Sequence, residues 1–345
     1  MTEAQQKVLD SIKQLPDQCL QAWEETKKLE FDSRGDEIWK VVSCGMGASG
    51  LPAHIITSAF KTNVPILSVN DYNLPSWVNE HTLVYLSSYS GNTEEVLSCA
   101  EQAQKNGCMV TGSTTGGQLG DFFQENNYPA YIFNPQHNPT GQPRMGLGYG
   151  LFGQLGILHK LEVVKNGDMD IEVSEGIKKL ESEVKDIKEV ARAMAGNLQG
   201  SVLVVLAAEH LVGNAHVFAN QLNETAKTFA AWFSIPEANH HLLEGLKHPA
   251  FKAKAIFLES ARYGTSISKR FQLTKQVLEK NGIESYYYKP EIDQKFPQDA
   301  NALPEVLNVL MFSSYVSYYL SEAYNEDPLA IPWVDYFKKE LESVI

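Results

Sequence analysis

The chain is short of positive charge. It has 29 Lys and Arg residues against 42 Asp and Glu residues, which gives a net charge of −13. Proteins that bind nucleic acid neutralise the backbone phosphates with clustered Lys and Arg side chains. The composition therefore argues against nucleic acid as a partner. It does not exclude a small phosphorylated ligand, because backbone N–H groups and hydroxyls can hold a single phosphate.

Cysteines and long apolar runs are also scarce. Cys19, Cys44, Cys99 and Cys108 show no CxxC spacing and no pairing with histidines. This predicts buried thiols in a reducing compartment rather than a disulfide framework or a zinc site. No apolar run approaches the roughly 20 residues that span a bilayer, and the polar, amphipathic first residues do not resemble a signal peptide. We expect a soluble cytoplasmic protein with no membrane partner, no metal and no cofactor.

Short apolar runs alternate with helix-length segments. The first series of runs, each closed by Gly, Ser or Asn, covers residues 39–45, 63–70, 82–88, 107–113 and 128–134. The second series covers residues 201–209, 229–235, 254–260 and 283–289. Buried strands that alternate with helices predict parallel sheets covered on both faces.

The two series predict two lobes of similar size. We expect an α/β fold in which each lobe is a parallel β-sheet flanked by helices, a three-layer α/β/α arrangement. The expected divisions are an N-terminal helical segment (1–36), a first lobe (37–160), a helical linker (161–199) and a second lobe with C-terminal helices (200–345).

Two glycine-containing turns follow strands of the first lobe. "SCGMGASG" (43–50) lets the backbone turn tightly and approach an anion at a helix N-terminus. The spacing of its glycines is also that of a dinucleotide-binding fingerprint. The alternative is a tight strand–helix turn that binds no ligand. "SSYSGNTEE" (87–95) places four hydroxyls at the next strand end. An N-cap needs only one of them, so a phosphate site is the better explanation. The absence of GK[ST] excludes a Walker-type loop.

Several motifs, in order, resemble the sugar isomerase (SIS) domain. They are "GMGASG", "DYNLPSWV", "SSYSGNTEE", "STTGGQL" and "QPRMGLGYG" in the first lobe, with "NQLNETAK" and "PEANHH" in the second. Together they resemble the bifunctional phosphoglucose/phosphomannose isomerase family from about residue 35 onward. "SYSGNT" alone specifies only an SIS domain, whereas the combination is far more specific.

The resemblance implies a set of substrate-binding residues in the first lobe. The turn against the substrate and the four phosphate ligands would be Gly47, Ala48, Ser49, Ser88, Ser90 and Thr93. Ala48 departs from the family, which usually has Gly there. Ser87 would end its strand, and Glu94 and Glu95 would stabilise the helix start rather than act in catalysis.

The resemblance also implies two charged catalytic residues. Arg144, in a Pro/Gly-rich loop, would stabilise a developing enediolate. Glu224, in a helical pattern, would move a proton between C1 and C2 of the sugar. Without the resemblance, a surface arginine and a solvated helix glutamate would be the default interpretations.

Ring opening is assigned by resemblance to His240, assisted by Lys338. The neighbours His241 and Lys339 leave both choices open, because adjacent helix residues cannot face one site. Members that accept both sugars often carry a threonine near the position of Leu329, which leaves the choice between glucose and mannose open.

The resulting expectation is an isomerase that interconverts glucose 6-phosphate with fructose 6-phosphate through a cis-enediolate, with mannose 6-phosphate left open as a second aldose. The alternatives are an SIS isomerase for an amino sugar phosphate or a longer ketose phosphate, and a non-catalytic sugar-phosphate sensor. The family also implies a homodimer. His216 and His240 are then the histidines through which a partner chain would complete the site.

Overall fold

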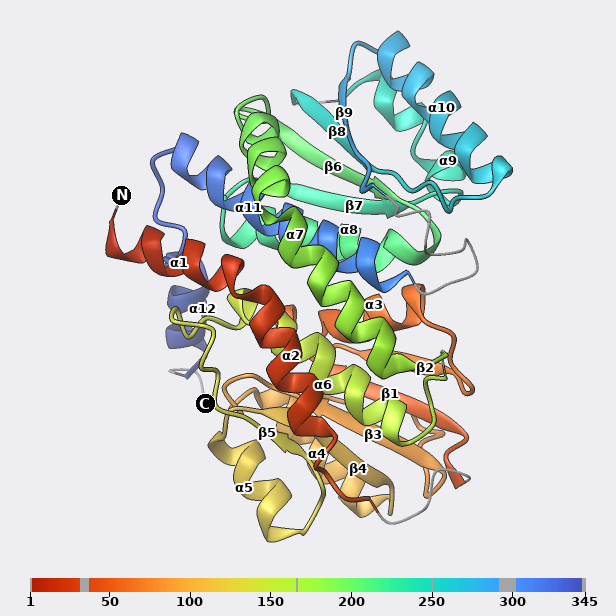
Figure 1. Ribbon diagram of the computed structural model, residues 1–345, viewed down its shortest axis with the longest axis vertical. Helices are drawn as coiled ribbons and strands as arrows, with labels where there is room; N and C mark the ends of the chain where they lie inside the picture. Colours follow the sequence, from red (N-terminus) through yellow and green to blue (C-terminus); the bar gives the residue numbers. More distant parts are fainter. Residues whose placement is uncertain (1, 32–36, 166, 250, 292–301, 343–345) are drawn as a thin grey trace.

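The computed structural model describes residues 2–31, 37–165, 167–249, 251–291 and 302–342. Two parallel sheets lie at opposite ends of the molecule, and long helices fill the space between them (Figure 1). The α/β class and the two lobes predicted from the alternating runs are confirmed.

The first sheet has five strands in the order β2-β1-β3-β4-β5. They are β1 (Lys40–Gly45), β2 (Ile66–Val69), β3 (Thr82–Ser87), β4 (Met109–Thr114) and β5 (Tyr131–Ile132). All neighbours pair in parallel. Gly45 pairs with Ser87, and Ser87 pairs with Ser113. Because these three strands end side by side, the loops that follow them meet at one edge of the sheet.

Two helices cover each face of the first sheet. Those on one face are α4 (Glu94–Lys105) and α5 (Gly117–Glu125), and those on the other are α3 (Leu51–Ala59) and α6 (Leu147–Lys160). Alternate strand residues enter the two cores: Val41 packs with α3 and α6, while Val42 packs with α4 and α5. Successive strand side chains point to opposite faces, so the continuous apolar runs are those of strands buried on both sides.

The second sheet has four parallel strands in the order β7-β6-β8-β9. They are β6 (Val202–Ala207), β7 (Ala230–Ser234), β8 (Ala253–Leu258) and β9 (Glu284–Tyr288). Its helices are α8 (Val212–Glu224), α9 (Ala238–His241), α10 (Thr265–Lys280) and α11 (Leu303–Ala323). Helix α11 is buried from Leu303 to Ser321, which explains why its sequence is apolar on all sides.

The remaining helices are α1 (Glu3–Lys13), α2 (Leu15–Thr26), α7 (Met169–Ala195) and α12 (Pro332–Glu342). Helix α2 lies against α6, where the Thr26 side chain faces Gly156. Helix α7 occupies most of the predicted linker, and it packs along α11, with Gly176 against Leu303 and Leu307. The domain divisions at residues 36, 160 and 199 stay predictions.

The two lobes touch where α3 meets α8. A Cβ at Gly213 would lie 2.5 Å from Ile55 Cα, so only a glycine lets the two helix backbones approach this closely. The backbone N–H of Gly213 also donates to Ser58 Oγ at 3.2 Å. This contact fixes the start of α8 against the first lobe.

Two further predictions concern the state of the cysteines and the presence of membrane-spanning helices. All four cysteines are buried free thiols, as the lack of pairing motifs predicted. None of the helices in the described ranges is long and apolar enough to cross a membrane.

Candidate functional site

The predicted phosphate ligands stand on two neighbouring loops. Residues 47–49 form a single turn of 3₁₀-helix, η2 (Gly47–Ser49), between β1 and α3. The next loop begins where β3 ends, at Ser87, as predicted. The two loops are joined by a hydrogen bond in which the backbone N–H of Tyr89 donates to Ser49 Oγ at 3.2 Å. We call residues 47–49 and 88–93 the hydroxyl cradle.

The hydroxyls of the cradle interact with one another. Ser88 is buried, its Oγ accepts from the backbone N–H of Gly91 at 3.1 Å, and it lies 2.7 Å from Thr93 Oγ1. Thr93 is the N-cap residue of α4, yet its side chain makes no capping hydrogen bond. Ser90 is exposed at the rim. The Thr93 hydroxyl therefore belongs to the cradle, beside the free N–H groups of the first turn of α4.

Gly91 is required by the close approach of a third loop. Its φ is +73°, and a Cβ there would lie 1.8 Å from the carbonyl oxygen of Gly116. The backbone N–H of Thr115 donates to the carbonyl of Tyr89, and that of Leu119 donates to the carbonyl of Gly91. The loop after β4 therefore supports the cradle from behind and fixes its shape.

A small cavity joins the cradle to the loop that carries Arg144. It is lined on one side by Ala48, Ser49 and Tyr89, and on the other by Pro143 and Gly146. The second side belongs to the 3₁₀-helix η3 (Pro143–Met145), at the start of α6. The turn that bears Arg144 is thus next to the cradle.

Arg144 is held in a fixed orientation inside the protein. Its side chain is 4% exposed, and Nη2 donates to the carbonyl oxygens of Pro328 (3.0 Å) and Leu329 (2.8 Å). Nη1 donates to Gln142 Oε1 at 3.2 Å and lies 3.7 Å from Glu224 Oε2. The guanidinium group is therefore aimed at the carboxylate that the resemblance assigns as the base.

Burial and the neighbouring charges have opposite effects on the pKa of Arg144. Burial lowers the pKa of Arg144, while the carboxylates of Glu224, Asp327 and Asp335 act in the opposite direction. Glu224 is the last residue of α8, and its side chain is 34% exposed. Glu224 is thus the more exposed member of the pair, and its carboxylate is accessible from solvent.

Lys227 is a second cation at this place, and the sequence reasoning did not single it out. Its Nζ donates to the carbonyl of Thr225 at 3.1 Å and also to that of Asp327. Burial and the neighbouring Arg144 lower the pKa of Lys227. The signal was present in the sequence, because Lys227 is the last residue of "NETAK".

The N-terminal helices support the arginine turn. Gln18 of α2 is fully buried, and its Nε2 donates to the carbonyl oxygens of His137 (3.0 Å) and Met145 (2.9 Å). Its Oε1 accepts from the backbone N–H of Gly148 at 3.2 Å. One side chain thus holds backbone groups on both sides of the turn.

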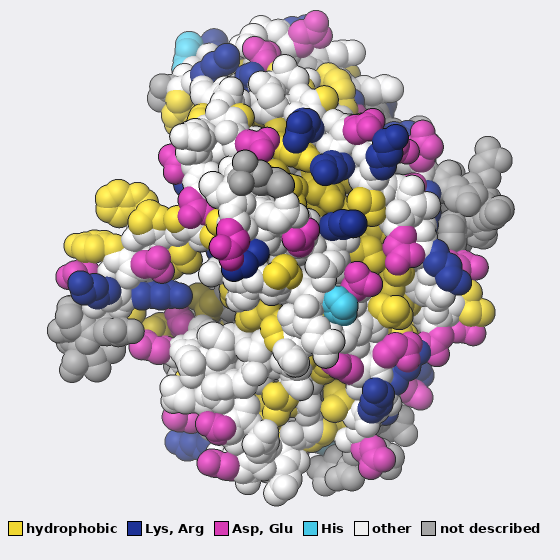
Figure 2. Space-filling model, turned by 60° about the vertical axis from the view of Figure 1, so that its left-hand side comes forward, with side chains coloured by type: hydrophobic (Ala, Val, Ile, Leu, Met, Phe, Trp, Pro, Cys, Tyr) yellow, Lys and Arg dark blue, Asp and Glu magenta, His cyan; other side chains and the backbone are white. Residues whose placement is uncertain are grey.

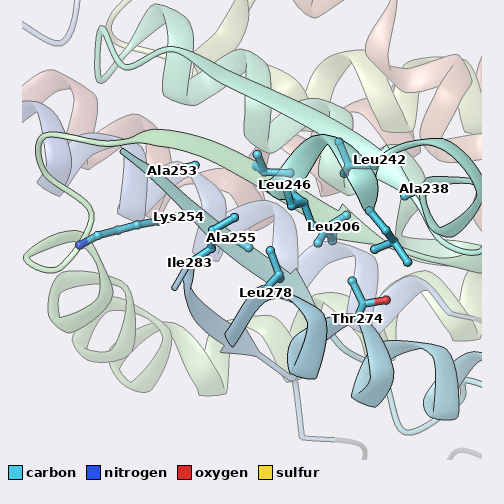
Figure 3. A pocket seen from close by; sticks show the side chains of 12 residues that line it. Leu206, Ala238, Leu242, Leu246, Ala253, Lys254, Ala255, Thr274, Leu278 and Ile283 are labelled. Atoms are coloured by element: carbon cyan, nitrogen blue, oxygen red, sulfur yellow. The ribbon is translucent and has the colours of Figure 1, made fainter. Parts of the chain in front are cut away.

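His240 lies elsewhere in the second lobe. Helix α9 rests on a small apolar cavity, into which Ala238, Leu242 and Leu246 point together with residues of α10 and the sheet (Figure 3). Since Ala238 and Leu242 face inward, His240 is on the exposed face. His241 instead contacts Glu237 (3.4 Å) and the ring of Phe233. The structure does not bring His240 to Arg144 or Glu224.

Lys338 stands on α12, on the surface. This helix carries exposed Trp333, Tyr336 and Phe337, and Figure 2 shows apolar side chains on the segment that projects at the left, where α12 lies. Helix α12 interacts with the site electrostatically, because the negative charge of Asp335 opposes the lowering of the Arg144 pKa by burial. The choice between Lys338 and Lys339 stays open.

A known protein family matches the part of the chain that contains the second lobe. Residues 187–341 match the family described as "Bacterial phospho-glucose isomerase C-terminal SIS domain". Curated relatives extend the similarity to the whole chain. A bifunctional phosphoglucose/phosphomannose isomerase from Caldicellulosiruptor bescii is 27% identical, over 98% of this chain and 99% of the relative. Another from Aquifex aeolicus is 28% identical, over 88% and 90%.

Two further comparisons show how widely the architecture is used. A D-glucosamine-6-phosphate 4-epimerase from Sulfolobus acidocaldarius is 27% identical over 59% of this chain and 63% of its own length. The crystal structure of tagatose-6-phosphate ketose/aldose isomerase from Escherichia coli superposes with a TM-score of 0.72 at 13% identity, covering 94% of this chain and 95% of that one. At that identity the likeness shows the fold alone.

These similarities agree with three observations: the order of the motifs along the chain, the two parallel sheets, and the cradle beside Arg144 and Glu224. Residues 187–341 thus match the C-terminal SIS domain of bacterial phosphoglucose isomerases, and the chain is similar to bifunctional phosphoglucose/phosphomannose isomerases along nearly its whole length.

Proposed function

We propose that the chain is an aldose–ketose isomerase that interconverts glucose 6-phosphate and fructose 6-phosphate, with mannose 6-phosphate as a further substrate. The observation that carries the proposal is the pairing of buried Arg144 with partly exposed Glu224 at 3.7 Å, beside a hydroxyl cradle. The two relatives named bifunctional phosphoglucose/phosphomannose isomerase support the choice of sugars.

The cradle fixes the phosphate end of the substrate. The hydroxyls of Ser49, Ser88, Ser90 and Thr93 donate hydrogen bonds to the phosphate oxygens, which take the place of the Ser88–Thr93 hydrogen bond, and the N-terminus of α4 favours the negative charge. Glu94 and Glu95, in the first turn of α4, stabilise the helix and have no catalytic role. Binding at the phosphate leaves C1 and C2 free to reach Glu224.

Proton transfer is the work of Glu224. Its carboxylate removes the proton from C2 of the open-chain aldose, and the electron pair moves to form the enediolate with its charge on O1. The protonated carboxyl then returns the proton to C1, while the hydroxyl proton at O2 moves to O1, which leaves the ketose. Arg144, always charged and already oriented, stabilises the enediolate oxygen.

Ring opening is the role proposed for His240, with Lys338. Both side chains are exposed in this chain and neither contacts the Arg144–Glu224 pair. We also propose that the protein is cytoplasmic and acts as a homodimer, which the family resemblance implies, because a second copy could bring such a residue to the site. A site that needs two copies loses turnover on dilution below the dimer dissociation constant.

A coupled assay tests the function directly. Fructose 6-phosphate is offered to the full chain, and the appearance of glucose 6-phosphate and mannose 6-phosphate is followed separately. Glucosamine 6-phosphate is included as a second candidate substrate, because one relative is named a D-glucosamine-6-phosphate 4-epimerase. Turnover of fructose 6-phosphate supports the proposal. Binding without turnover of any of these sugars would instead indicate a sensor.

The cradle assignment predicts a binding defect. The double variant Ser90→Ala/Thr93→Ala removes two hydroxyl donors to a charged phosphate, and we expect the KM for fructose 6-phosphate to rise by roughly 10²-fold. The thermal midpoint should fall only slightly, because Ser90 is exposed, Thr93 does not cap its helix, and the change removes one hydrogen bond, between Thr93 and Ser88. A matched double variant, Ser182→Ala/Thr265→Ala on α7 and α10, should leave KM unaltered. An unchanged KM in the cradle variant would contradict the assignment.

A further inference from the structure

A second, larger cavity lies between the lobes and shares the η2 turn with the hydroxyl cradle. Its volume is about 830 Å³, and the residues that matter here are Gly47, His54, His216 and Trp232. Gly47 and His54 belong to the first lobe, through η2 and α3, and His216 and Trp232 belong to the second, through α8 and β7. The proposed reaction gives neither histidine a step, and the expectation that His216 meets a partner chain stays a prediction.

The two imidazoles form a hydrogen bond across the lobe boundary. His54 Nδ1 and His216 Nδ1 are 2.9 Å apart, so one nitrogen carries the proton and the other accepts it. The Trp232 ring lies 5.1 Å from His54 and 5.0 Å from His216 between ring centroids. Burial lowers the pKa of both histidines, and burial together with the neighbouring His54 lowers that of His216 to about 4. The pair is therefore neutral at pH 7 and holds one proton between the facing nitrogens.

The hydrogen bond joins the two segments that carry the proposed chemistry. His54 lies one turn into α3, whose preceding turn is η2 with Ser49. His216, Asn220 and Glu224 follow at intervals of four residues on α8, so they occupy one face of that helix. Gly213 packs α8 onto α3 one turn before His216. The position of Glu224 relative to the cradle is thus set at this helix crossing.

We propose that His54 and His216 are positioning residues that hold Glu224 at its working distance from the bound sugar phosphate; this rests on the proposed function. Two apolar side chains would pack the helices equally well without the cost of burying imidazoles. A hydrogen bond has a direction and a length, so it fixes the rotation of α8 on α3 in a way that apolar packing does not. A base displaced by about 1 Å can lose as much as 10²-fold in rate.

The test compares two substitutions of His216. His216→Phe keeps a flat ring beside Trp232 and removes the hydrogen bond, whereas the amide of His216→Asn occupies nearly the place of Nδ1 and keeps it. We expect His216→Phe to lower kcat by about tenfold or more with KM for fructose 6-phosphate within about twofold, because the cradle is untouched. His216→Asn should keep most of the wild-type kcat.

A control separates positioning from general destabilisation. His159 is also a partly buried histidine that stacks on a tryptophan, Trp23, at 5.7 Å. It lies near the far end of α6, so His159→Phe should leave kcat and KM near wild-type values whatever its thermal midpoint. If His216→Phe does not fold, His54→Phe and His54→Asn make the same comparison from α3.

The outcomes distinguish a positioning role of the His54–His216 pair from a merely structural one. An unchanged kcat in His216→Phe, equal losses in the Phe and Asn variants, or a loss confined to KM would overturn the positioning role. Nitrogen NMR of the wild-type imidazoles is independent of turnover: one protonated and one bare Nδ1 support the pair, and two bare Nδ1 atoms remove it. A wild-type chain that binds sugar phosphates without turnover would remove the proposed function, and with it this role.

Discussion

Replacement of Glu224 by glutamine is expected to lower kcat for fructose 6-phosphate by about 10²–10⁴-fold and to leave the affinity for the sugar phosphate nearly unchanged. The amide has the shape of the carboxylate but cannot take a proton from carbon. Binding should survive because the phosphate is held by the cradle, on other loops. The measurements are the steady-state rate in the coupled assay and the dissociation constant by calorimetry.

An isotope experiment makes this prediction sharper. In deuterated water, the wild-type chain should place deuterium at C1 or C2 of the product wherever the protonated base exchanges with solvent, and Glu224→Gln should not. Glu322 offers a matched control, since it also lies near the end of a helix and 4.0 Å from an arginine, Arg192. Glu322→Gln should retain the wild-type rate. Near-normal turnover in Glu224→Gln would take this residue out of the mechanism.

Replacement of Arg144 by methionine is the second large effect. We expect kcat to fall by about 10²–10³-fold, which is the usual consequence of removing a donor to a developing oxyanion. The folded state should also be less stable, because the carbonyl oxygens of Pro328 and Leu329 would lose their donor inside the protein. Both the rate and the thermal midpoint are therefore measured.

The lysine variant separates charge from geometry at the same position. Arg144→Lys keeps the positive charge but loses the planar fork that serves both carbonyls and the carboxylate. Its rate should lie between those of the wild type and Arg144→Met. Arg192→Met is the matched control, because Arg192 stacks on Tyr319 and is 66% exposed. A rate loss in Arg144→Met no greater than the loss of folded protein would argue for a purely structural arginine.

Local patterns in the sequence predicted most of the fold. Apolar runs such as 39–45 and 82–88 are strands that end within one residue of the expected positions. The reason is physical: a parallel strand buried on both faces must be continuously apolar, and it stops where hydroxyls and glycine begin. The same reasoning located Ser88 and Thr93 at the end of β3, in the loop where the structure joins them.

Contacts between distant segments could not be predicted in this way. The carbonyl oxygens that hold Arg144 come from residues 184 and 185 positions further along the chain, and a backbone carbonyl leaves no trace in the identity of its residue. The partners His54 and His216 are 162 residues apart. The roles of His240 and Lys338 came from resemblance, and they stay predictions.

Gln18 has a consequence for any attempt to work with one lobe alone. The sequence suggests a cut near residue 36, which would leave a tidy sheet with its cradle. That cut also discards the amide that holds the carbonyls of His137 and Met145 and the N–H of Gly148. The excised lobe would keep Arg144 in its sequence while losing the support that orients it. The N-terminal helices therefore support the turn that carries Arg144, and the proposed site depends on them as well as on the loops proposed to bind the sugar phosphate.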